Sequence, residues 1–316
     1  MTTDLATDND YDVVVIGAGA GGLNAALLLA RARRKVAVVD NGQPRNAPAE
    51  HMHGFLSRDG MPPSAFLEVG REEVTGYGAT MIGAVVDDLV AADGGGFTAA
   101  LDNGEVLRAR SVVVAAGLRD ELPDIPGLRD RWGRDVVHCP YCHGYEFRDQ
   151  ALGVLGTSPG AVFHAQLLRQ WSADVVLFAH TLEISAEDRA TLDARGIEVV
   201  DGAVAEVVVQ DDAVRGVELA DGNLVDRTGV FVVPRMVPRD ALLTKVGCAV
   251  GEDGWVTVDK AGRTSVPGVY AVGNVIDPKA QVVTAAGMGS AAGFAINIDL
   301  VQQDVAAAVA ARATAS

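Results

Sequence analysis

The chain has 316 residues, of which 49% are hydrophobic and 36 are glycine, and its formal net charge is -16 at pH 7. This length predicts two domains, and the negative charge argues against nucleic acid and anionic membranes as partners. Three cysteines are too few for a disulfide framework. No uncharged apolar run reaches the roughly 18 residues of a membrane helix, and the first ten residues lack a signal-peptide pattern. We therefore expect a cytoplasmic protein.

The first 40 residues have the pattern of a strand, a tight turn, a helix and a second strand. Residues 11–16 are a β-branched apolar run, and Gly17, Gly19 and Gly22 follow before a helix-forming stretch. Such glycines let the backbone and the helix amino terminus approach a pyrophosphate. Asp40 ends the second strand, where its carboxylate can accept hydrogen bonds from a ribose diol. We interpret this unit as a dinucleotide site; glycines that only pack a turn are the alternative.

The composition changes after Asn41. Residues 41–55 are rich in Pro, Asn and His and lack periodicity, which is typical of a functional loop. His51 and His53 in this loop could reach an active site or lie on the surface. A helix is predicted next, over 63–77, followed by a β-meander with strands at 84–91, 97–102 and 105–109. A buried strand over 111–117 then ends in small residues, and a Pro-rich boundary follows at 121–127.

A second strand, helix and strand follow at 152–156, 161–172 and 174–180. Further strands are predicted at 197–202, 205–212, 214–222 and 229–235. A strand ending at Gly273 and an Ala-rich helix over about 281–301 look like a return to the first domain. We therefore predict an α/β fold with one domain over 1–119 and 239–316 and another over 120–238.

Residues 264–274 form a second fingerprint that favours FAD over NAD as the first dinucleotide. They make a strand that ends in small residues and Asn274. Such a segment can offer backbone N–H groups and one polar side chain to the ribitol and pyrophosphate of a flavin.

The pair Cys139 and Cys142 is the most specific chemical feature. Two thiols separated by two residues at a helix start can close a disulfide, and the helix field lowers a thiolate pKa; two small buried residues are the alternative reading. His143 follows the pair and could move the proton of thiol–disulfide exchange, or bond a backbone carbonyl at a turn. His138 is a second candidate. We predict no metal site, because neighbours so close in sequence rarely surround one ion. Cys248 is predicted to be a small buried hydrophobe.

The order of these motifs resembles the low-molecular-weight thioredoxin reductase family over nearly the whole chain. The resemblance implies two Rossmann-like domains, FAD held by the first domain and the carboxy-terminal segment, redox cysteines inserted in the second domain, and a homodimer. The family has an aspartate where this chain has Asn274, whose amide can still bond a ribitol. The residues that we predict to hold FAD are Gly17, Gly19, Ala20, Gly22, Asp40, Asn41, Arg45, Asn46, Ala116, Gly117, Gly273, Asn274, Gln281 and Val282.

Two features depart from the thioredoxin reductases. Their nucleotide loop and basic strand end are replaced here by a loop over 156–161 that contains Ser158, and by His180 and Thr181, so the arginine clamp for a 2′-phosphate is missing. His143 stands where the reductases usually carry an acidic residue. Both departures are shared with the FAD-dependent dithiol oxidases of the gliotoxin and holomycin oxidase type.

That resemblance implies that a small-molecule dithiol exchanges with the enzyme disulfide and that electrons pass through FAD to O2, giving H2O2. By family position Cys139 faces the substrate, Cys142 faces the flavin, and His143 is the general base, with His138 beside the pair. One alternative is a disulfide reductase that draws electrons from NADH, ferredoxin or another unusual donor. Another is an FAD-binding redox sensor without turnover.

Overall fold

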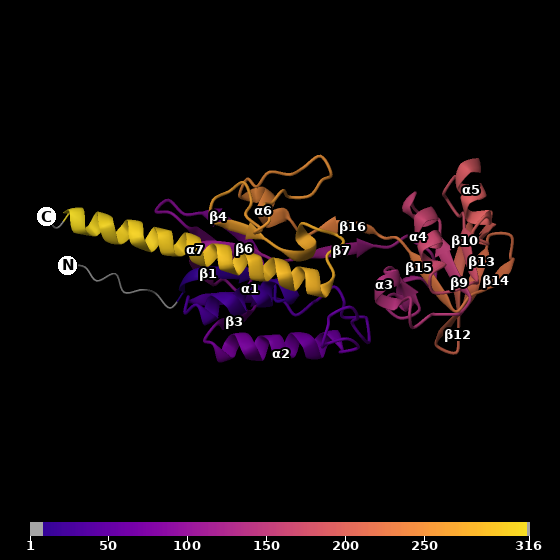
Figure 1. Ribbon diagram of the computed structural model, residues 1–316, viewed down its shortest axis with the longest axis horizontal. Helices are drawn as coiled ribbons and strands as arrows, with labels where there is room; N and C mark the ends of the chain where they lie inside the picture. The colour runs from indigo at the N-terminus through magenta and orange to yellow at the C-terminus, as the bar shows by residue number, and fades with distance from the viewer. Residues whose placement is uncertain (1–8, 315–316) are drawn as a thin grey trace. The chain divides into compact units, whose positions relative to one another are not determined.

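The apolar run near the amino terminus forms β1 (Asp10–Ile16), a central strand of a seven-stranded sheet in the computed structural model, which describes residues 9–314 (Figure 1). Val13 and Val15 belong to one hydrophobic core, and Val14 and Ile16 belong to a second core. Successive side chains of a strand point to opposite faces, so both faces of this sheet are covered. This explains why the run is apolar throughout and does not alternate with polar residues.

The predicted β1, helix and strand are confirmed, and the chain adds parallel and antiparallel strands around them. The sheet order is β3-β2-β1-β6-β5-β4, and β17 pairs with the carboxyl end of β6. The β4–β5 and β5–β6 pairs are antiparallel, as the predicted meander requires. The other pairs of this sheet, including β1–β6 and β6–β17, are parallel. The other elements of this part are α1 (Ala20–Arg31), β2 (Val36–Asp40), α2 (Pro63–Gly76), β3 (Thr80–Gly83), β4 (Val86–Ala91), β5 (Phe97–Leu101), β6 (Val106–Val114), α6 (Ala241–Lys245), β17 (Val269–Ala271), η2 (Gly273–Val275) and α7 (Val282–Thr314).

The carboxy-terminal helix α7 packs on α1 through small residues. A Cβ at Gly293 would lie 3.0 Å from the carbonyl oxygen of Ala25, and one at Gly289 would overlap the carbonyl of Gly21. The predicted end of this helix near residue 301 is wrong, because α7 continues to Thr314. Leu300 is its last buried residue. The exposed Ala-rich remainder is helical mainly through intrinsic propensity, and Asp304 near its start pairs with Arg34 and Arg110.

The second sheet has five parallel strands in the order β11-β10-β9-β15-β8. Between β11 and β15 along the chain, β12, β13 and β14 form a separate three-stranded antiparallel sheet. Helix α5 was not predicted, although Ser185 caps it by accepting a hydrogen bond from the backbone N–H of Asp188 at 3.0 Å. The elements are β7 (Leu118–Glu121), η1 (Arg129–Arg131), β8 (Val136–Val137), α3 (Pro140–His143), β9 (Leu152–Leu155), α4 (Gly160–Leu168), β10 (Val175–Phe178), α5 (Ala186–Asp193), β11 (Glu198–Val200), β12 (Val204–Gln210), β13 (Ala213–Leu219), β14 (Leu224–Asp226), β15 (Gly229–Val232) and β16 (Arg235–Pro238).

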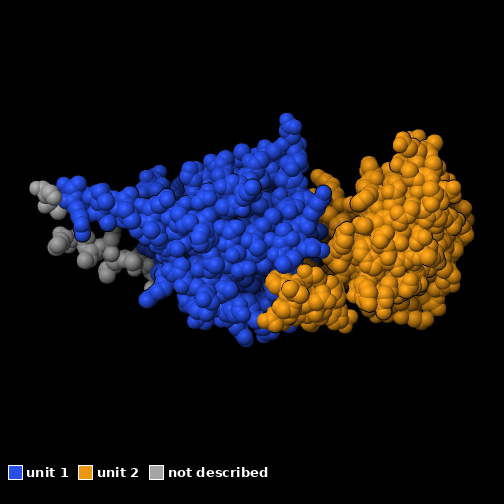
Figure 2. Space-filling view, viewed as in Figure 1, with its two compact units in different colours: residues 1–45, 64–119, 238–316 blue, residues 46–63, 120–237 orange. Residues whose placement is uncertain are grey.

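The chain divides into two compact units (Figure 2). Unit 1 contains residues up to 45, 64–119 and those from 238 onward, and unit 2 contains 46–63 and 120–237. The segment 46–63, which the sequence assigned to the first domain, therefore clusters with unit 2. Among the helices of residues 9–314, none combines the length and hydrophobicity that a membrane crossing requires.

Candidate active site

The glycine loop after β1 contains two glycines whose Cβ would clash with the backbone and one, Gly19, that has open space beside it. Gly17 has φ +103°, and a Cβ there would lie 2.5 Å from the carbonyl oxygen of Ala115. A Cβ at Gly22 would overlap the carbonyl of Gly17. Gly19 is the N-cap of α1, just before Ala20, and a Cβ there would meet nothing within 4 Å. The loop thus presents bare backbone at a helix amino terminus, which fits a dinucleotide pyrophosphate.

Asp40 lies at the end of β2 and fastens this loop. Its Oδ1 accepts a hydrogen bond from the Ala18 N–H at 2.9 Å, and its Oδ2 accepts one from the Gly42 N–H at 3.1 Å. Nη2 of Arg71, on α2, lies 3.4 Å from the same Oδ2. Asn41 beside it closes an Asx turn, since its Oδ1 accepts a hydrogen bond from the backbone of residue 43 at 3.2 Å. Sequence reasoning missed Arg71, because it is separated from Asp40 by 31 residues and belongs to no motif.

The predicted residues of the carboxy-terminal fingerprint meet Arg45. Gly273 has φ +74°, and Asn274 follows it in η2. The Asn274 amide donates to the carbonyls of Asp277 at 2.9 Å and Ala280 at 3.0 Å, while Arg45 Nη1 donates to its Oδ1 at 3.4 Å. The amide N–H groups therefore hold the turn before α7, and only Oδ1 and the backbone of Asn274 remain for a ribitol.

The other predicted cofactor residues lie at the ends of elements. Gln281 precedes the first residue of α7, Val282, and its carbonyl accepts the Ala285 N–H at 2.8 Å. Ala116 and Gly117 follow β6; Gly117 has φ +70° with open space around a Cβ. These residues, with the glycine loop and Asp40, make unit 1 fit to hold FAD. Asn46 belongs by clustering to unit 2.

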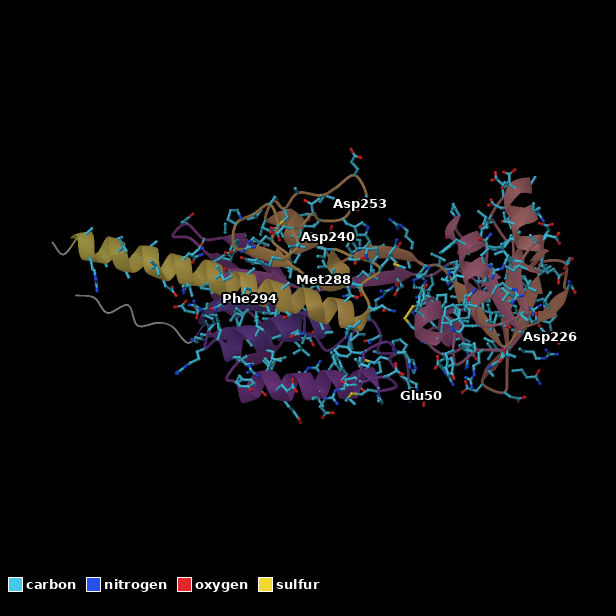
Figure 3. The ribbon with its side chains drawn as sticks, in the orientation of Figure 1. Glu50, Asp226, Asp240, Asp253, Met288 and Phe294 are labelled. Atoms are coloured by element: carbon cyan, nitrogen blue, oxygen red, sulfur yellow. A yellow bond between two sulfur atoms is a disulfide. The ribbon has the colours of Figure 1, made fainter. Side chains whose placement is uncertain are left out.

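Cys139 and Cys142 form a disulfide with their Cα atoms 5.2 Å apart, which Figure 3 draws as a yellow bond. Cys139 is the N-cap of α3, and its carbonyl accepts hydrogen bonds from the N–H groups of Cys142 and His143, both at 3.1 Å. Because α3 is a single turn, the predicted helix field at the thiols is small. We call residues 138–146 the redox turn.

His143 is half-buried and follows the disulfide directly in the chain. Its two ring nitrogens are shielded from solvent, and neither makes a hydrogen bond of ordinary geometry in the described structure. Burial lowers the pKa of His143 below its usual value, although a contact with the Cys139 backbone and the charge of Glu146 act in the opposite direction. A neutral imidazole with an unused lone pair is suited to accept a proton at neutral pH.

His138 packs edge to face against His164 of α4, with ring centroids 5.8 Å apart. His164 is 6% exposed and hydrogen bonds to the backbone of His138, and burial lowers its pKa to about 4. Sequence reasoning missed His164, which stands inside an apolar helical stretch with no motif around it. It connects the backbone that precedes Cys139 to α4, the helix that follows the loop over 156–161.

The two residues of the strand end where a nucleotide would bind make hydrogen bonds within unit 2. Thr181 Oγ1 donates to the carbonyl of Gly156 at 3.4 Å, and the Val204 N–H donates to His180 Nδ1 at 2.9 Å. The hydroxyl oxygen of Ser158 is buried. Burial also lowers the pKa of His180, so the residue stays neutral at pH 7. Positive charge for a 2′-phosphate is therefore not supplied at this strand end.

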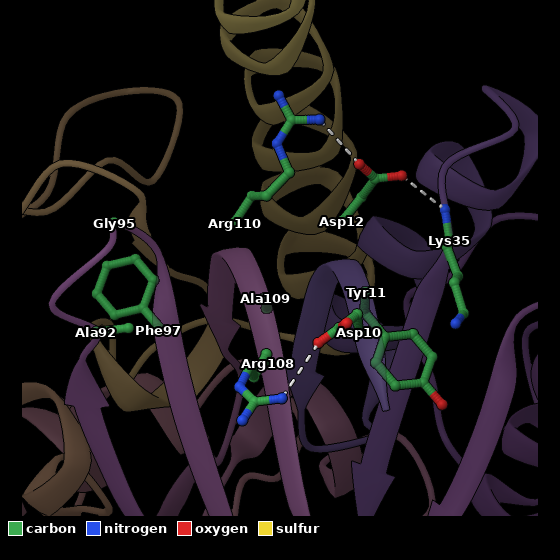
Figure 4. Close-up of a pocket in the computed structure, with 10 residues that line it drawn as sticks. All are labelled: Asp10, Tyr11, Asp12, Lys35, Ala92, Gly95, Phe97, Arg108, Ala109 and Arg110. Carbon is green, nitrogen blue, oxygen red and sulfur yellow. Dashed lines mark hydrogen bonds and ion pairs between the residues drawn. The ribbon is translucent and has the colours of Figure 1, made fainter. Parts of the chain in front are cut away.

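A hollow of about 400 Å³ lies at the amino end of β1, away from the glycine loop (Figure 4). Its charged groups contact one another: Arg110 Nη1 lies 3.0 Å from Asp12 Oδ1, and Arg108 Nη1 lies 3.7 Å from Asp10 Oδ1. Lys35 Nζ lies over the ring of Tyr11, 4.9 Å from its centroid. Ligands of parallel α/β sheets bind at the carboxyl ends of strands, so this hollow is not the candidate site.

The chain is similar in sequence and structure to several known proteins. The sequence profile of the pyridine nucleotide-disulphide oxidoreductases matches residues 11–290. The chain is 30% identical over 315 residues to thioredoxin reductase sirT of Leptosphaeria maculans, covering 94% of this chain and 96% of that one. It is similar to the crystal structure of HlmI, with 64% identity, a TM-score of 0.94 and coverage of 97% and 98%. The crystal structure of a thioredoxin reductase TrxB of Bacillus anthracis aligns with 31% identity, a TM-score of 0.89 and coverage of 93% and 99%.

Proposed function

Because the chain belongs to the pyridine nucleotide-disulphide oxidoreductase family and is a thioredoxin reductase-like flavoprotein that binds FAD, we propose that it oxidises a small-molecule dithiol to a disulfide. The Cys139–Cys142 pair is the proposed exchange site and O2 the proposed electron acceptor. Membership of the family shows that the chain is an FAD-dependent oxidoreductase.

The observation that carries the proposed direction is the strand end of unit 2, which supplies no basic clamp. His180 and Thr181 stand where a basic clamp would bind a 2′-phosphate, and both are used in hydrogen bonds within the protein. An NADPH donor would lack bidentate, permanently charged contacts there. The disulfide and its histidine are nevertheless in place. Electrons are therefore proposed to enter from a dithiol.

The exchange step uses the redox turn. His143 takes the proton of one substrate thiol, and the thiolate attacks Sγ of Cys139, which breaks the Cys139–Cys142 bond and leaves Cys142 as a thiolate. The second substrate thiol gives its proton to the Cys142 thiolate and attacks the substrate sulfur of this mixed disulfide, which releases Cys139 as a thiolate that takes the proton held by His143. The substrate leaves as a disulfide, and two electrons remain in the cysteine pair. FAD bound in unit 1 would accept two electrons and pass them to O2, giving H2O2.

His143 is the residue that makes the first step efficient. Its ring nitrogens are shielded from solvent and its lowered pKa leaves it uncharged near pH 7, so a lone pair is available without prior loss of a proton. Cys139 is assigned to the substrate and Cys142 to the flavin by position in the family. His138 is proposed to support the pair through its packing on His164.

The test is an anaerobic titration of the FAD-loaded protein, followed by flavin absorbance near 450 nm. Dithiothreitol should bleach the flavin, while NADPH and NADH should not, and peroxide should appear when air is admitted. Cys139→Ser and Cys142→Ser variants should each lose bleaching by dithiothreitol. Dithiol oxidation that survives both changes would exclude the cysteine route.

A disulfide reductase is the second candidate, because relatives such as thioredoxin reductase sirT carry that name. Its donor would be NADH, ferredoxin or another compound that does not need the missing clamp. Prompt bleaching by NADH, or by a reduced ferredoxin, would support it. Stoichiometric reduction without re-oxidation or turnover would instead indicate a redox sensor.

A homodimer is proposed from the resemblance and from one face of α7. This face carries exposed apolar side chains at spacings of four, three, four and four residues, which place them within one stripe of a helix. They are Phe294, Ile298, Val301, Val305 and Val309, and Figure 3 labels the first. A second copy pairing the same stripe would remove it from water, as an isologous interface does.

A further inference from the structure

The segment 46–63 is a loop of unit 2 whose backbone is held by contacts within that unit. Met52 and Met61 form an antiparallel bridge, and the Met52 N–H donates to the Met61 carbonyl at 3.0 Å. At the start of the segment, Pro48 lies against Gly133, where a Cβ would come within 2.5 Å of the Pro48 Cβ. The backbone around His53 is therefore held from two sides.

His53 stands between two carboxylates. Its Nδ1 lies 3.3 Å from Asp59 Oδ2, and its Nε2 lies 3.4 Å from Glu146 Oε1. Asp59 is itself held, because its Oδ1 accepts a hydrogen bond from the Gly54 N–H at 2.8 Å. Glu146 follows His143 by three residues at the end of the redox turn. One imidazole thus connects the segment 46–63 to the residues that carry the disulfide.

We propose that His53 and Glu146 are positioning residues of the redox turn, through which the segment 46–63 fixes the charges around His143. This inference rests on the proposed role of His143 as the base in dithiol oxidation. Neither residue contacts the reacting sulfurs in the proposed steps. They act through the base, because they place one negative and one ionisable positive group near it.

The two residues act on the base in opposite directions. The carboxylate of Glu146 favours protonated His143 and so raises the pKa of His143. The charge of His53 disfavours the protonated form and so lowers that pKa. Burial of His143 has the largest effect on that pKa and lowers it. Around the bridge, Asp59 contacts His53, and the ring of His51 lies 6.4 Å from that of His53. Cys139 and Cys142 add two thiols when the disulfide is reduced.

The experiment compares His53→Gln and Glu146→Gln in the full-length, FAD-loaded protein, with His51→Gln as the control. His51→Gln removes an imidazole from the same loop but leaves the Asp59–His53–Glu146 bridge intact. The chain has six histidines, so ring-labelled histidine gives a simple NMR titration, and His143→Asn assigns the resonance of His143. The second readout is the pH dependence of anaerobic flavin bleaching by dithiothreitol.

Glu146→Gln should lower the pKa of His143 and His53→Gln should raise it, each by roughly 0.3–0.5 of a pH unit, the size expected for partly exposed charges that are screened by solvent. Both displacements should shrink in 1 M salt. His51→Gln should leave the titration within about 0.1 of a pH unit of the unchanged protein. The pH limb of bleaching should move with the NMR value in each variant.

Displacements of equal sign, or none in either variant, would overturn the inference and leave the bridge with a merely structural role. The NMR titration does not require turnover. If no dithiol bleaches the flavin while the opposite displacements are observed, the proposed function fails and the tuning of His143 stands.

Discussion

Gly19→Ala is a sharp test of where FAD binds, because it should separate stability from cofactor affinity. Gly19 has φ -72° and ψ 179°, which alanine adopts without strain, and the new Cβ would meet no protein atom within 4 Å. Alanine is a poorer N-cap by roughly 0.5 kcal/mol. It also restricts the unfolded chain, which stabilises by roughly 0.4–1 kcal/mol. The free energy of unfolding of the cofactor-free protein should therefore change by less than about 0.5 kcal/mol.

FAD affinity should respond very differently. The space above Gly19 is the space through which a pyrophosphate reaches the N–H groups of α1, and a methyl group there prevents that approach. We expect the Kd for FAD to rise at least about 100-fold, which is about 2.7 kcal/mol. Urea unfolding of the apoprotein and fluorescence titration with FAD measure the two quantities. Gly76→Ala, at another open position with negative φ, is the control and should leave the Kd unchanged. An unchanged Kd in Gly19→Ala would refute the proposed cradle.

Three further changes test other parts of the molecule. His143→Asn should slow anaerobic bleaching by dithiothreitol about 100-fold, and should remove the loss of rate that the unchanged protein shows as pH falls through the lowered pKa of His143. Asp299→Asn should destabilise the protein by roughly 1–2 kcal/mol in urea, because Asp299 accepts two hydrogen bonds from Arg263 and one from the buried Tyr270. The pKa of Asp299 is lowered, mainly by Arg263, so this stabilisation should be complete above about pH 4 and disappear as pH falls through the folded-state pKa; a variant whose deficit is constant down to pH 2 would contradict this. Val305→Asp should convert the proposed dimer to a monomer in light scattering, and an unchanged mass would argue against the α7 stripe.

The strands and the glycine loop were predictable because their signals are local. The apolar run of β1 and the positive φ of Gly17 both follow from rules that involve only neighbouring residues and sheet burial. The carboxyl end of α7 was missed for the converse reason. Burial supplies the periodicity by which a helix is recognised, and beyond Leu300 the helix has no buried face, only alanine-rich propensity.

The supporting residues of the site could not be predicted, because they come from distant parts of the chain. Arg71 reaches Asp40 from a different helix, and His164 reaches the backbone before Cys139 from α4. The composition of residues 41–55 makes His53 a candidate for the site, but its pairing with Glu146 spans 93 positions and depends on the fold of the segment 46–63. Such contacts leave no spacing in a single sequence.

The parallel sheet of unit 2 brings two segments on which the proposed function depends, the redox turn and the loop over 156–161, to one edge. Strand β8 ends directly before His138 and Cys139, and β9 ends before Gly156, and both strands run parallel to β15 between them. The carboxyl ends of parallel strands share one edge, so the redox turn and the loop over 156–161 lie at the same edge. With the clamp positions occupied by neutral groups, and a net charge of -16 on the chain, that edge suits an uncharged dithiol better than a polyanionic nucleotide. Under the proposed function, this edge would present the disulfide to a dithiol without a bound nucleotide beside it.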